Sequence, residues 1–301
     1  MAAAVRDRTC PAPPEPGSAL AATRDGSAPA LPVPAGVVDD GAVADWDGRS
    51  YREVSALQTW LATESLTGVA MTGNERVLDV GCGDGRITAA ICDQLPDGSI
   101  LGIDPSPRMI AAASTFRSPR LRFAVGDVLT MPYRDEFDAV VSFNALHWVP
   151  EQNAALSRIR AALHDRAWAL VQVVCQGERP SLEAVAMRTC DRPAWRGYFA
   201  GFRPPFVHVD PTRYAELAAA AGLRLVDRDV TDRRWDFDTA EEFARWCRVG
   251  FDSWTARLPD DRAAAFVADV LAAYEQVTGS PRSFRFMQLR ARLVTASLPS
   301  L

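Results

Sequence analysis

The stretch VLDVGCGDG, residues 77–85, decides the fold of this chain. A short apolar run leads into three alternating glycines, Gly81, Gly83 and Gly85, and apolar residues at helical spacing follow in residues 86–95. Glycines between a strand and a helix let the backbone turn tightly and approach a ligand closely. The GxGxG spacing differs from the GxGxxG of dinucleotide-binding folds and from phosphate-binding loops. The stretch therefore predicts a strand, a ligand-binding loop and a helix.

Strand and helix patterns alternate on both sides of this loop. Such alternation is typical of an α/β fold with a doubly wound, Rossmann-like sheet, here of seven strands. Ser106 and Pro107 fit the N-cap and first position of one helix. Expected strands are 76–80, 99–104, 121–127, 137–143, 167–175, 224–230 and 284–294, and expected helices are 51–66, 86–95, 106–114, 151–163, 210–223, 239–250 and 260–279.

Three segments fall outside the alternating pattern. Residues 1–44 are rich in Ala, Pro, Gly and Ser, and we expect a disordered leader before a catalytic domain at 45–301. Residues 177–209 and 236–280 interrupt the second half of that domain. Ligands bind beyond the carboxyl ends of the strands in such sheets, so we expect these two insertions to form a helical lid there.

The composition excludes several classes of function. The chain has 301 residues, a net charge of −5 and 33 basic residues, all of them arginine. Without lysine there is no Schiff-base cofactor and no phosphate-loop lysine. No basic patch suggests a nucleic-acid partner, and no long apolar run suggests a membrane span.

The six cysteines form no CxxC pair and have no histidine cluster beside them, so we expect neither a metal site nor a disulfide framework. No signal peptide is evident, and cytoplasmic localisation is the expectation. The sequence does not indicate an oligomeric state.

Three successive strands end in an aspartate, at Asp79, Asp104 and Asp127. A carboxylate at the second strand end can accept hydrogen bonds from both hydroxyls of a ribose, and one at the third can accept from an exocyclic amine. No arginine stands within two residues of any of these acids, which suits a cationic nucleoside better than a pyrophosphate. S-adenosylmethionine has a sulfonium, an ammonium, a ribose and an adenine, and it is the expected cofactor.

Together the stretches VLDVGCGDG, GIDPSPRMI and VGDVLTMPYRDEFDAVVSFNALHWV resemble the class I S-adenosylmethionine-dependent methyltransferases, over most of residues 46–295. The usual PGG turn before the fifth strand is replaced by LHDRAWAL, a departure that leaves the cofactor site intact. The resemblance implies that Asp138 supports its strand. The cofactor-binding residues that it implies are Asp79, Gly81, Gly83 and Gly85 at the methionine end, Asp104 at the ribose, Asp127 and Val128 at the adenine, Asn144 near the methionine amine, and in addition Cys82, Pro105 and Met109.

A narrower resemblance is to the trans-aconitate and juvenile hormone acid methyltransferases, which methylate carboxylates. It rests on YREVSALQTW and NALHWV, and it implies catalytic roles for Gln58 and Trp148, whose N–H groups would orient the acceptor carboxylate. An ionised carboxylate needs no general base. His147 is then optional, but it is the candidate base if the acceptor is a phenol, an amine or a carbon acid of secondary metabolism.

Aromatic residues in and near the first insertion predict a small-molecule acceptor that is bulky and apolar. The same residues are equally compatible with a core that belongs to the lid itself. Two further alternatives are a cofactor-binding partner protein without catalysis and, more distantly, a nicotinamide dehydrogenase. The candidate acceptor-binding residues are Tyr51, Trp148, Trp195, Tyr198, Phe199 and Phe202.

Overall fold

The structure is a computed structural model that describes residues 57, 60, 63, 64, 66, 67 and 71–295. The expected leader at 1–44 and the candidates Tyr51 and Gln58 lie outside the described residues. The described residues between 57 and 66 are helical, in agreement with the helix expected there.

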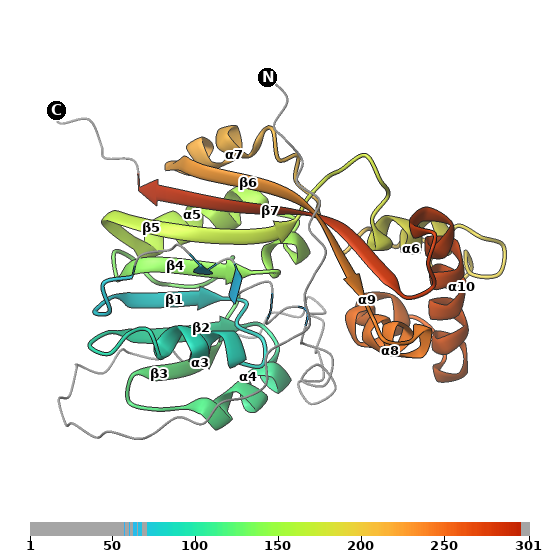
Figure 1. The fold of residues 1–301 in the computed structure, drawn as a ribbon, viewed down its shortest axis with the longest axis horizontal. Helices are drawn as coiled ribbons and strands as arrows, with labels where there is room; N and C mark the ends of the chain where they lie inside the picture. The colour runs from blue at the N-terminus through green and yellow to red at the C-terminus, as the bar shows by residue number, and fades with distance from the viewer. Residues whose placement is uncertain (1–56, 58–59, 61–62, 65, 68–70, 296–301) are drawn as a thin grey trace.

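A seven-stranded sheet forms the centre of the molecule (Figure 1), in the order β3-β2-β1-β4-β5-β7-β6. The first five strands are parallel, and β7 runs antiparallel to both of its neighbours. This arrangement confirms the predicted α/β sheet. The strands are β1 (Arg76–Val80), β2 (Ser99–Asp104), β3 (Leu121–Val125), β4 (Phe137–Phe143), β5 (Leu163–Val174), β6 (Leu223–Asp236) and β7 (Ser283–Thr295).

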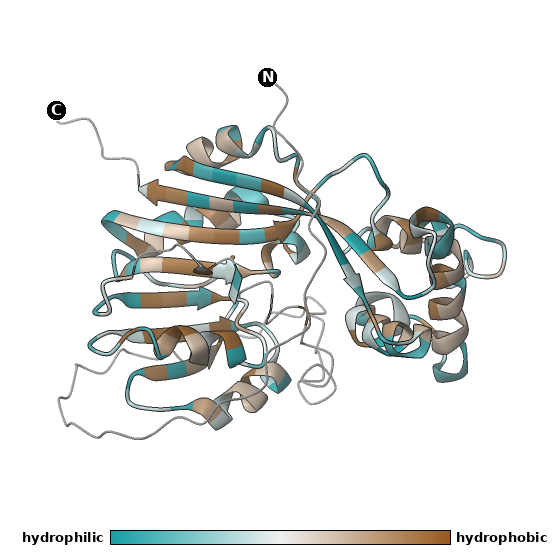
Figure 2. Cartoon of the chain, viewed as in Figure 1, coloured by the Kyte–Doolittle hydropathy of each residue, from teal (hydrophilic) through white to brown (hydrophobic). Residues whose placement is uncertain are grey.

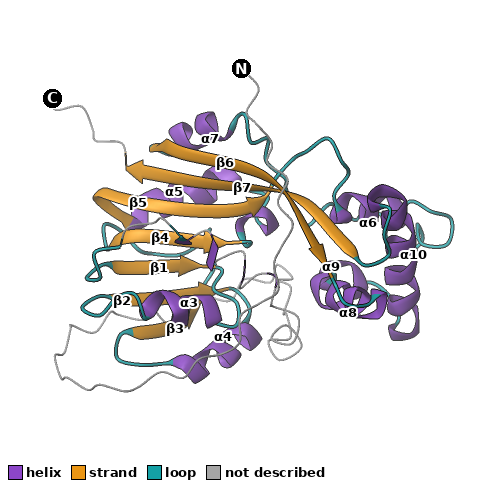
Figure 3. Cartoon of the chain, viewed as in Figure 1, coloured by secondary structure: helices purple, strands orange, loops and turns teal. Residues whose placement is uncertain are grey.

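Helices and short 3-10 turns connect the strands (Figure 3). Ser106 accepts a hydrogen bond from the Met109 N–H and Pro107 opens the helix, which confirms the predicted cap. The helices are α3 (Arg86–Cys92), α4 (Pro107–Ala113), η1 (Ser114–Phe116), η2 (Leu146–Trp148), α5 (Gln152–Ala162), α6 (Leu182–Cys190), α7 (Tyr214–Ala220), α8 (Ala240–Gly250), α9 (Asp252–Thr255) and α10 (Asp260–Thr278).

Strand β6 is longer than the sequence pattern indicates. It pairs with β7 from Leu223 opposite Thr295 to Asp236 opposite Ser283, whereas its apolar pattern ends near residue 230. The added part is charged, and ladder hydrogen bonds and ion pairs stabilise it in place of apolar burial. The two strands therefore continue past the sheet and carry the chain into a second lobe (Figure 1).

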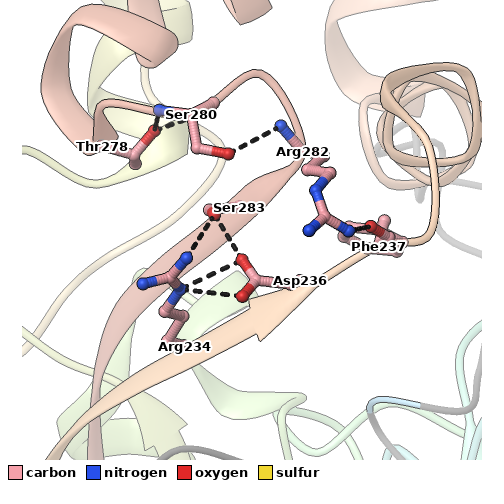
Figure 4. Close-up of polar contacts among 7 residues, drawn as sticks. All are labelled: Arg234, Asp236, Phe237, Thr278, Ser280, Arg282 and Ser283. Carbon is pink, nitrogen blue, oxygen red and sulfur yellow. Dashed lines mark hydrogen bonds and ion pairs between the residues drawn. The ribbon is translucent and has the colours of Figure 1, made fainter.

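This helical lobe consists of α6, residues 191–209 and α8–α10, and it lies beyond the carboxyl ends of the parallel strands (Figure 1). Polar contacts close its base where the chain enters after β6 and returns to β7 (Figure 4). Asp236 accepts from Ser283 and pairs with Arg234 at 3.0 Å, and the Arg282 guanidinium donates to the Phe237 carbonyl at 2.8 Å. These contacts fix the entry and exit of the lobe relative to the sheet.

Three groups of buried apolar side chains hold the fold together. Two lie on opposite faces of the sheet, one under α5 and α7 and the other under α3 and α4. The third fills the helical lobe and reaches the ends of β5 and β7. Figure 2 shows the apolar colour concentrated on the central strands, while much of β6 is hydrophilic. Among the described residues, no helix is both long and apolar enough to span a membrane.

Candidate functional site

The glycine loop after β1 requires glycine for two separate reasons. Gly81, Gly83 and Gly85 all have positive φ, at 75°, 54° and 82°, which side chains rarely adopt. A Cβ on Gly81 would also lie 2.2 Å from the Cβ of Ala145, in the segment after β4. The two neighbouring strand ends therefore approach each other closely, and the backbone of the loop borders a cavity between them.

Asp104, at the end of β2, is oriented by two backbone donors. Its Oδ2 accepts from the Gly83 N–H at 3.0 Å and its Oδ1 from the Ser106 N–H at 2.9 Å. Burial raises the pKa of Asp104 to about 6, although the two N–H donors act in the opposite direction. The carboxylate borders the cavity, so its remaining lone pairs are placed to accept hydrogen bonds from a ligand.

Asp79 has a different position from Asp104. It is buried behind the loop, where its Oδ2 accepts from the Thr88 hydroxyl of α3 at 2.7 Å, and it does not border the cavity. Burial, with a smaller contribution from the nearby Asp104, raises the pKa of Asp79 to about 7, although the hydrogen bond from Thr88 acts in the opposite direction. Asp79 thus ties the loop to the first turn of the helix instead of facing the cavity. Asp138 accepts from the Arg76 N–H at 2.8 Å, which supports its strand as the resemblance implies.

One cavity of about 380 Å³ extends from the glycine loop to the helical lobe. Its size falls in the range of roughly 300–1,000 Å³ typical of small-molecule sites. Of the predicted cofactor-binding residues, Asp79, Cys82 and Gly85 do not border it. Those that do are Gly81, Gly83, Asp104, Pro105, Met109, Asp127, Val128 and Asn144.

Asn144 follows β4 with a positive φ of 54°. Its backbone N–H donates to the Gln172 carbonyl at 2.8 Å, which anchors it to β5. Both polar atoms of its side-chain amide are buried without a hydrogen-bond partner. Because a buried amide without partners is unfavourable, this side chain is placed to exchange hydrogen bonds with a polar group of a ligand in the cavity next to it.

His147 and Trp148 lie in the 3-10 turn η2, and both border the cavity. His147 is 5% exposed and its Nδ1 has no hydrogen-bond partner. Burial lowers the pKa of His147 to about 3, with a further contribution from His208, so its imidazole is neutral at pH 7. A group with so low a pKa is a weak general base at neutral pH.

Glu183 is a cavity residue that the sequence analysis did not single out. It lies in the first turn of α6 and is 5% exposed, and its Oε2 is 3.7 Å from the Nε2 of His208. In sequence it resembles any acidic residue in the first turn of a helix, which is favourable in itself. Only the packing of the lobe brings it to the cavity.

The aromatic residues of 191–209 have a structural position in the lobe. Trp195 donates to Asp269 at 2.8 Å and packs edge-on against Phe266, and Phe199 packs on the same ring. Neither these two nor Tyr198 and Phe202 border the cavity, in contrast to the acceptor contacts expected from the sequence. The reason is that α10 presents Phe266 to this segment, so that Trp195 and Phe199 join the core of the lobe, while Tyr198 is exposed.

Other apolar residues form the wall of the cavity on the lobe side. They come from the ends of β5 and β7, from α6 and α8, from the residue between α8 and α9, and from residues 57 and 205, and no arginine is among the described residues that border the cavity. The described residues also contain no group of three His, Cys, Asp or Glu that could hold a metal ion. The apolar members are Leu57, Val174, Leu182, Pro205, Trp246, Val249, Phe251, Phe284 and Phe286.

Comparisons with known proteins agree with this geometry. A family described as a methyltransferase domain matches residues 77–166. The trans-aconitate 2-methyltransferase of Variovorax paradoxus is 28% identical over 259 residues, which are 81% of this chain and 96% of that protein. The protein of the same name from a Mycobacterium species is 30% identical over 234 residues, or 77% of this chain and 90% of that one.

Solved structures share the fold. A phosphoethanolamine N-methyltransferase of Haemonchus contortus, solved with phosphomonomethylethanolamine and S-adenosylhomocysteine, superposes with a TM-score of 0.56. The match covers 84% of this chain and 58% of that one at 15% identity. Similarity at this level of identity extends to the architecture of the sheet and its helices.

Proposed function

This chain belongs to the class I S-adenosylmethionine-dependent methyltransferases and resembles their trans-aconitate 2-methyltransferases, and we propose that it methylates the carboxylate of a mostly apolar small molecule. The observation that carries the proposal is the state of His147. His147 is neutral at pH 7 and only weakly basic, because burial lowers its pKa to about 3. A carboxylate acceptor is already ionised at pH 7 and requires no base.

The residues around the glycine loop fit S-adenosylmethionine, the cofactor of this family. Gly81 and Ala145 lie so close together that only backbone fits between the glycine loop and the segment after β4. Asp104 is oriented to accept hydrogen bonds from the ribose hydroxyls of the cofactor. The Asn144 amide is available to the methionine end of the cofactor. Asp127 accepts from the Leu129 N–H at 2.7 Å, and it borders the cavity together with Val128, where the adenine would lie. Asp79 acts indirectly in this arrangement, through Thr88 and the loop.

When bound, the cofactor supplies an electrophilic methyl group on its sulfonium. Transfer of that methyl to a carboxylate oxygen would give a methyl ester without loss of a proton, so no residue of this chain would need to act as a base. Trp148 borders the cavity beside the loop, and its indole N–H is the proposed donor that orients the carboxylate. Exclusion of water by the apolar walls assists the reaction.

The walls of the cavity limit the acceptor further. Its lobe side is lined mainly by aromatic and aliphatic residues, and no described lining residue is an arginine. An acceptor with several carboxylates would bury charge there without a cationic partner, which is unfavourable. We therefore propose an acceptor with one carboxylate on an apolar body, unlike the tricarboxylate named for the relatives.

A second candidate is an acceptor that loses a proton, such as a phenol or an amine. It is favoured by one observation, the unpartnered Nδ1 of His147 in the cavity wall. This candidate requires the pKa of His147 to rise towards neutrality when the acceptor binds.

Products and variants together distinguish the two candidates. Screening organic acids, phenols and amines with methyl-labelled cofactor should yield a product whose label alkali releases, as it does from esters but not from aryl ethers or methylamines. His147→Ala should retain kcat within a few-fold, while Trp148→Phe should lower kcat/KM by roughly tenfold or more through loss of a charge-assisted hydrogen bond.

Two matched variants serve as controls, because His164 and Trp168 lie outside the cavity. His164→Ala and Trp168→Phe should leave kcat/KM near the wild-type value. An alkali-stable product, together with loss of activity in His147→Ala, would refute the carboxylate assignment in favour of the second candidate.

A further inference from the structure

Glu183 is a buried carboxylate that faces the acceptor side of the cavity. Its side chain is 7% exposed, and its Oε2 has no hydrogen-bond partner. The residue comes from α6 of the helical lobe, whereas the cofactor-side residues come from the strand ends. Glu183 is therefore placed to contact the acceptor.

The surrounding groups leave the charge of Glu183 uncompensated. Burial lowers the pKa of His208, although Glu183 acts in the opposite direction, and the Nε2 of His208 is 3.7 Å from Glu183, beyond hydrogen-bonding distance. The other titratable groups that interact with Glu183 are the buried Cys247 of α8 and Tyr274 of α10. Tyr274 exchanges hydrogen bonds with the backbone of Arg285, so its hydroxyl is engaged elsewhere.

The nearby arginines of the lobe base also have other partners. Arg179, which lies between β5 and α6, donates to Asp232 of β6 at 3.1 Å, and Arg285 of β7 donates to the same carboxylate at 2.7 Å. Neither arginine borders the cavity. An isolated carboxylate in an apolar cavity is unfavourable unless a cation or a hydrogen-bond donor reaches it.

We infer that Glu183 is the recognition site for a protonated amino group of the acceptor. The inference rests on the proposed function and extends it, because the acceptor then has three parts: a carboxylate near Trp148, an apolar body along the lobe wall, and an ammonium at Glu183. Such an acceptor is an amino acid that has either a bulky apolar side chain or a longer apolar chain between its amino group and its carboxylate. Glu183 and Trp148 both border the cavity, and His208 lies between them: it is 3.7 Å from Glu183, and its ring centroid is 6.3 Å from that of His147, the neighbour of Trp148.

The test uses three probes of similar shape, 4-phenylbutylamine, 4-phenylbutan-1-ol and 4-phenylbutanoate. Their binding to the S-adenosylhomocysteine-loaded enzyme is measured by calorimetry. The wild-type enzyme should bind the amine roughly tenfold or more tightly than the alcohol. Glu183→Gln should abolish that preference, leave the alcohol nearly unchanged and improve binding of the carboxylate, because a like charge has been removed.

Glu241→Gln is the matched control, since Glu241 is an exposed residue of α8 outside the cavity. It should behave as wild type, and equal affinity for S-adenosylhomocysteine should verify that each variant is folded. The inference is overturned if wild type and Glu183→Gln treat the three probes alike, whether all bind or none does. It is also overturned if the alcohol binds wild type as tightly as the amine. An alkali-stable methyl product alongside the predicted amine preference would refute the carboxylate proposal alone.

Discussion

Gly81→Ala is the sharpest test of how the cofactor loop is built. The substitution places a Cβ at φ +75°, which costs about 1–2 kcal/mol by itself. The new Cβ would also lie 2.2 Å from that of Ala145, so one of the two strand ends must shift, at a further cost of about 1–3 kcal/mol. We expect the free energy of unfolding to fall by about 2–5 kcal/mol and the affinity for S-adenosylmethionine to fall at least tenfold.

Gly279→Ala separates the two contributions. Gly279 has nearly the same φ, +74°, but a Cβ there meets no atom within 4 Å, so only the backbone term of about 1–2 kcal/mol applies. Ala145→Gly in the Gly81→Ala background should restore the steric part, with Ala145→Gly alone completing the cycle. Urea unfolding and calorimetric titration of the cofactor measure both quantities. If Gly81→Ala is no less stable than Gly279→Ala, the close approach of the strand ends is not what requires glycine.

Two further predictions concern the buried carboxyls. Asp104→Asn should weaken S-adenosylmethionine binding by about 2 kcal/mol, because the ribose hydroxyls lose a charged acceptor. The affinity of the wild-type enzyme should fall as pH drops through about 6, the raised pKa of Asp104. An affinity that calorimetry finds independent of pH would contradict this reasoning. The raised pKa of Asp79, about 7, means that the folded state binds more protons than the unfolded state between about pH 4 and 7, so the free energy of unfolding should decrease as pH rises through that window. In Asp79→Asn this decrease should be smaller, and urea unfolding at pH 5 and pH 8 measures it. If the free energy of unfolding changes between the two pH values by as much in the variant as in the wild type, the reasoning is wrong.

Local sequence patterns were sufficient to predict the sheet and the glycine loop. The alternation of strand and helix signals and the glycines of residues 81–85 determine structure through contacts between residues close in sequence. The acids at the strand ends come together because adjacent parallel strands end at the same edge. Because the carboxyl ends of adjacent strands meet at one edge, Asp104, Asp127 and Asn144 reach one cavity as soon as the strand order is set. Asp79 shows the limit of such reasoning, since its side chain points to Thr88 behind the loop.

What the sequence by itself determined is therefore the sheet, the cofactor loop and the family to which the chain belongs. Only the tertiary structure decided which lobe residues face the cavity: Phe266 packs against Trp195 and Phe199 in the lobe core, while Glu183 borders the cavity. The physical reason is that the side of a lobe helix that faces the cavity depends on contacts between segments such as α6 and α10, which lie far apart in the chain. Composition marks such residues as aromatic or acidic, and packing determines what each of them touches.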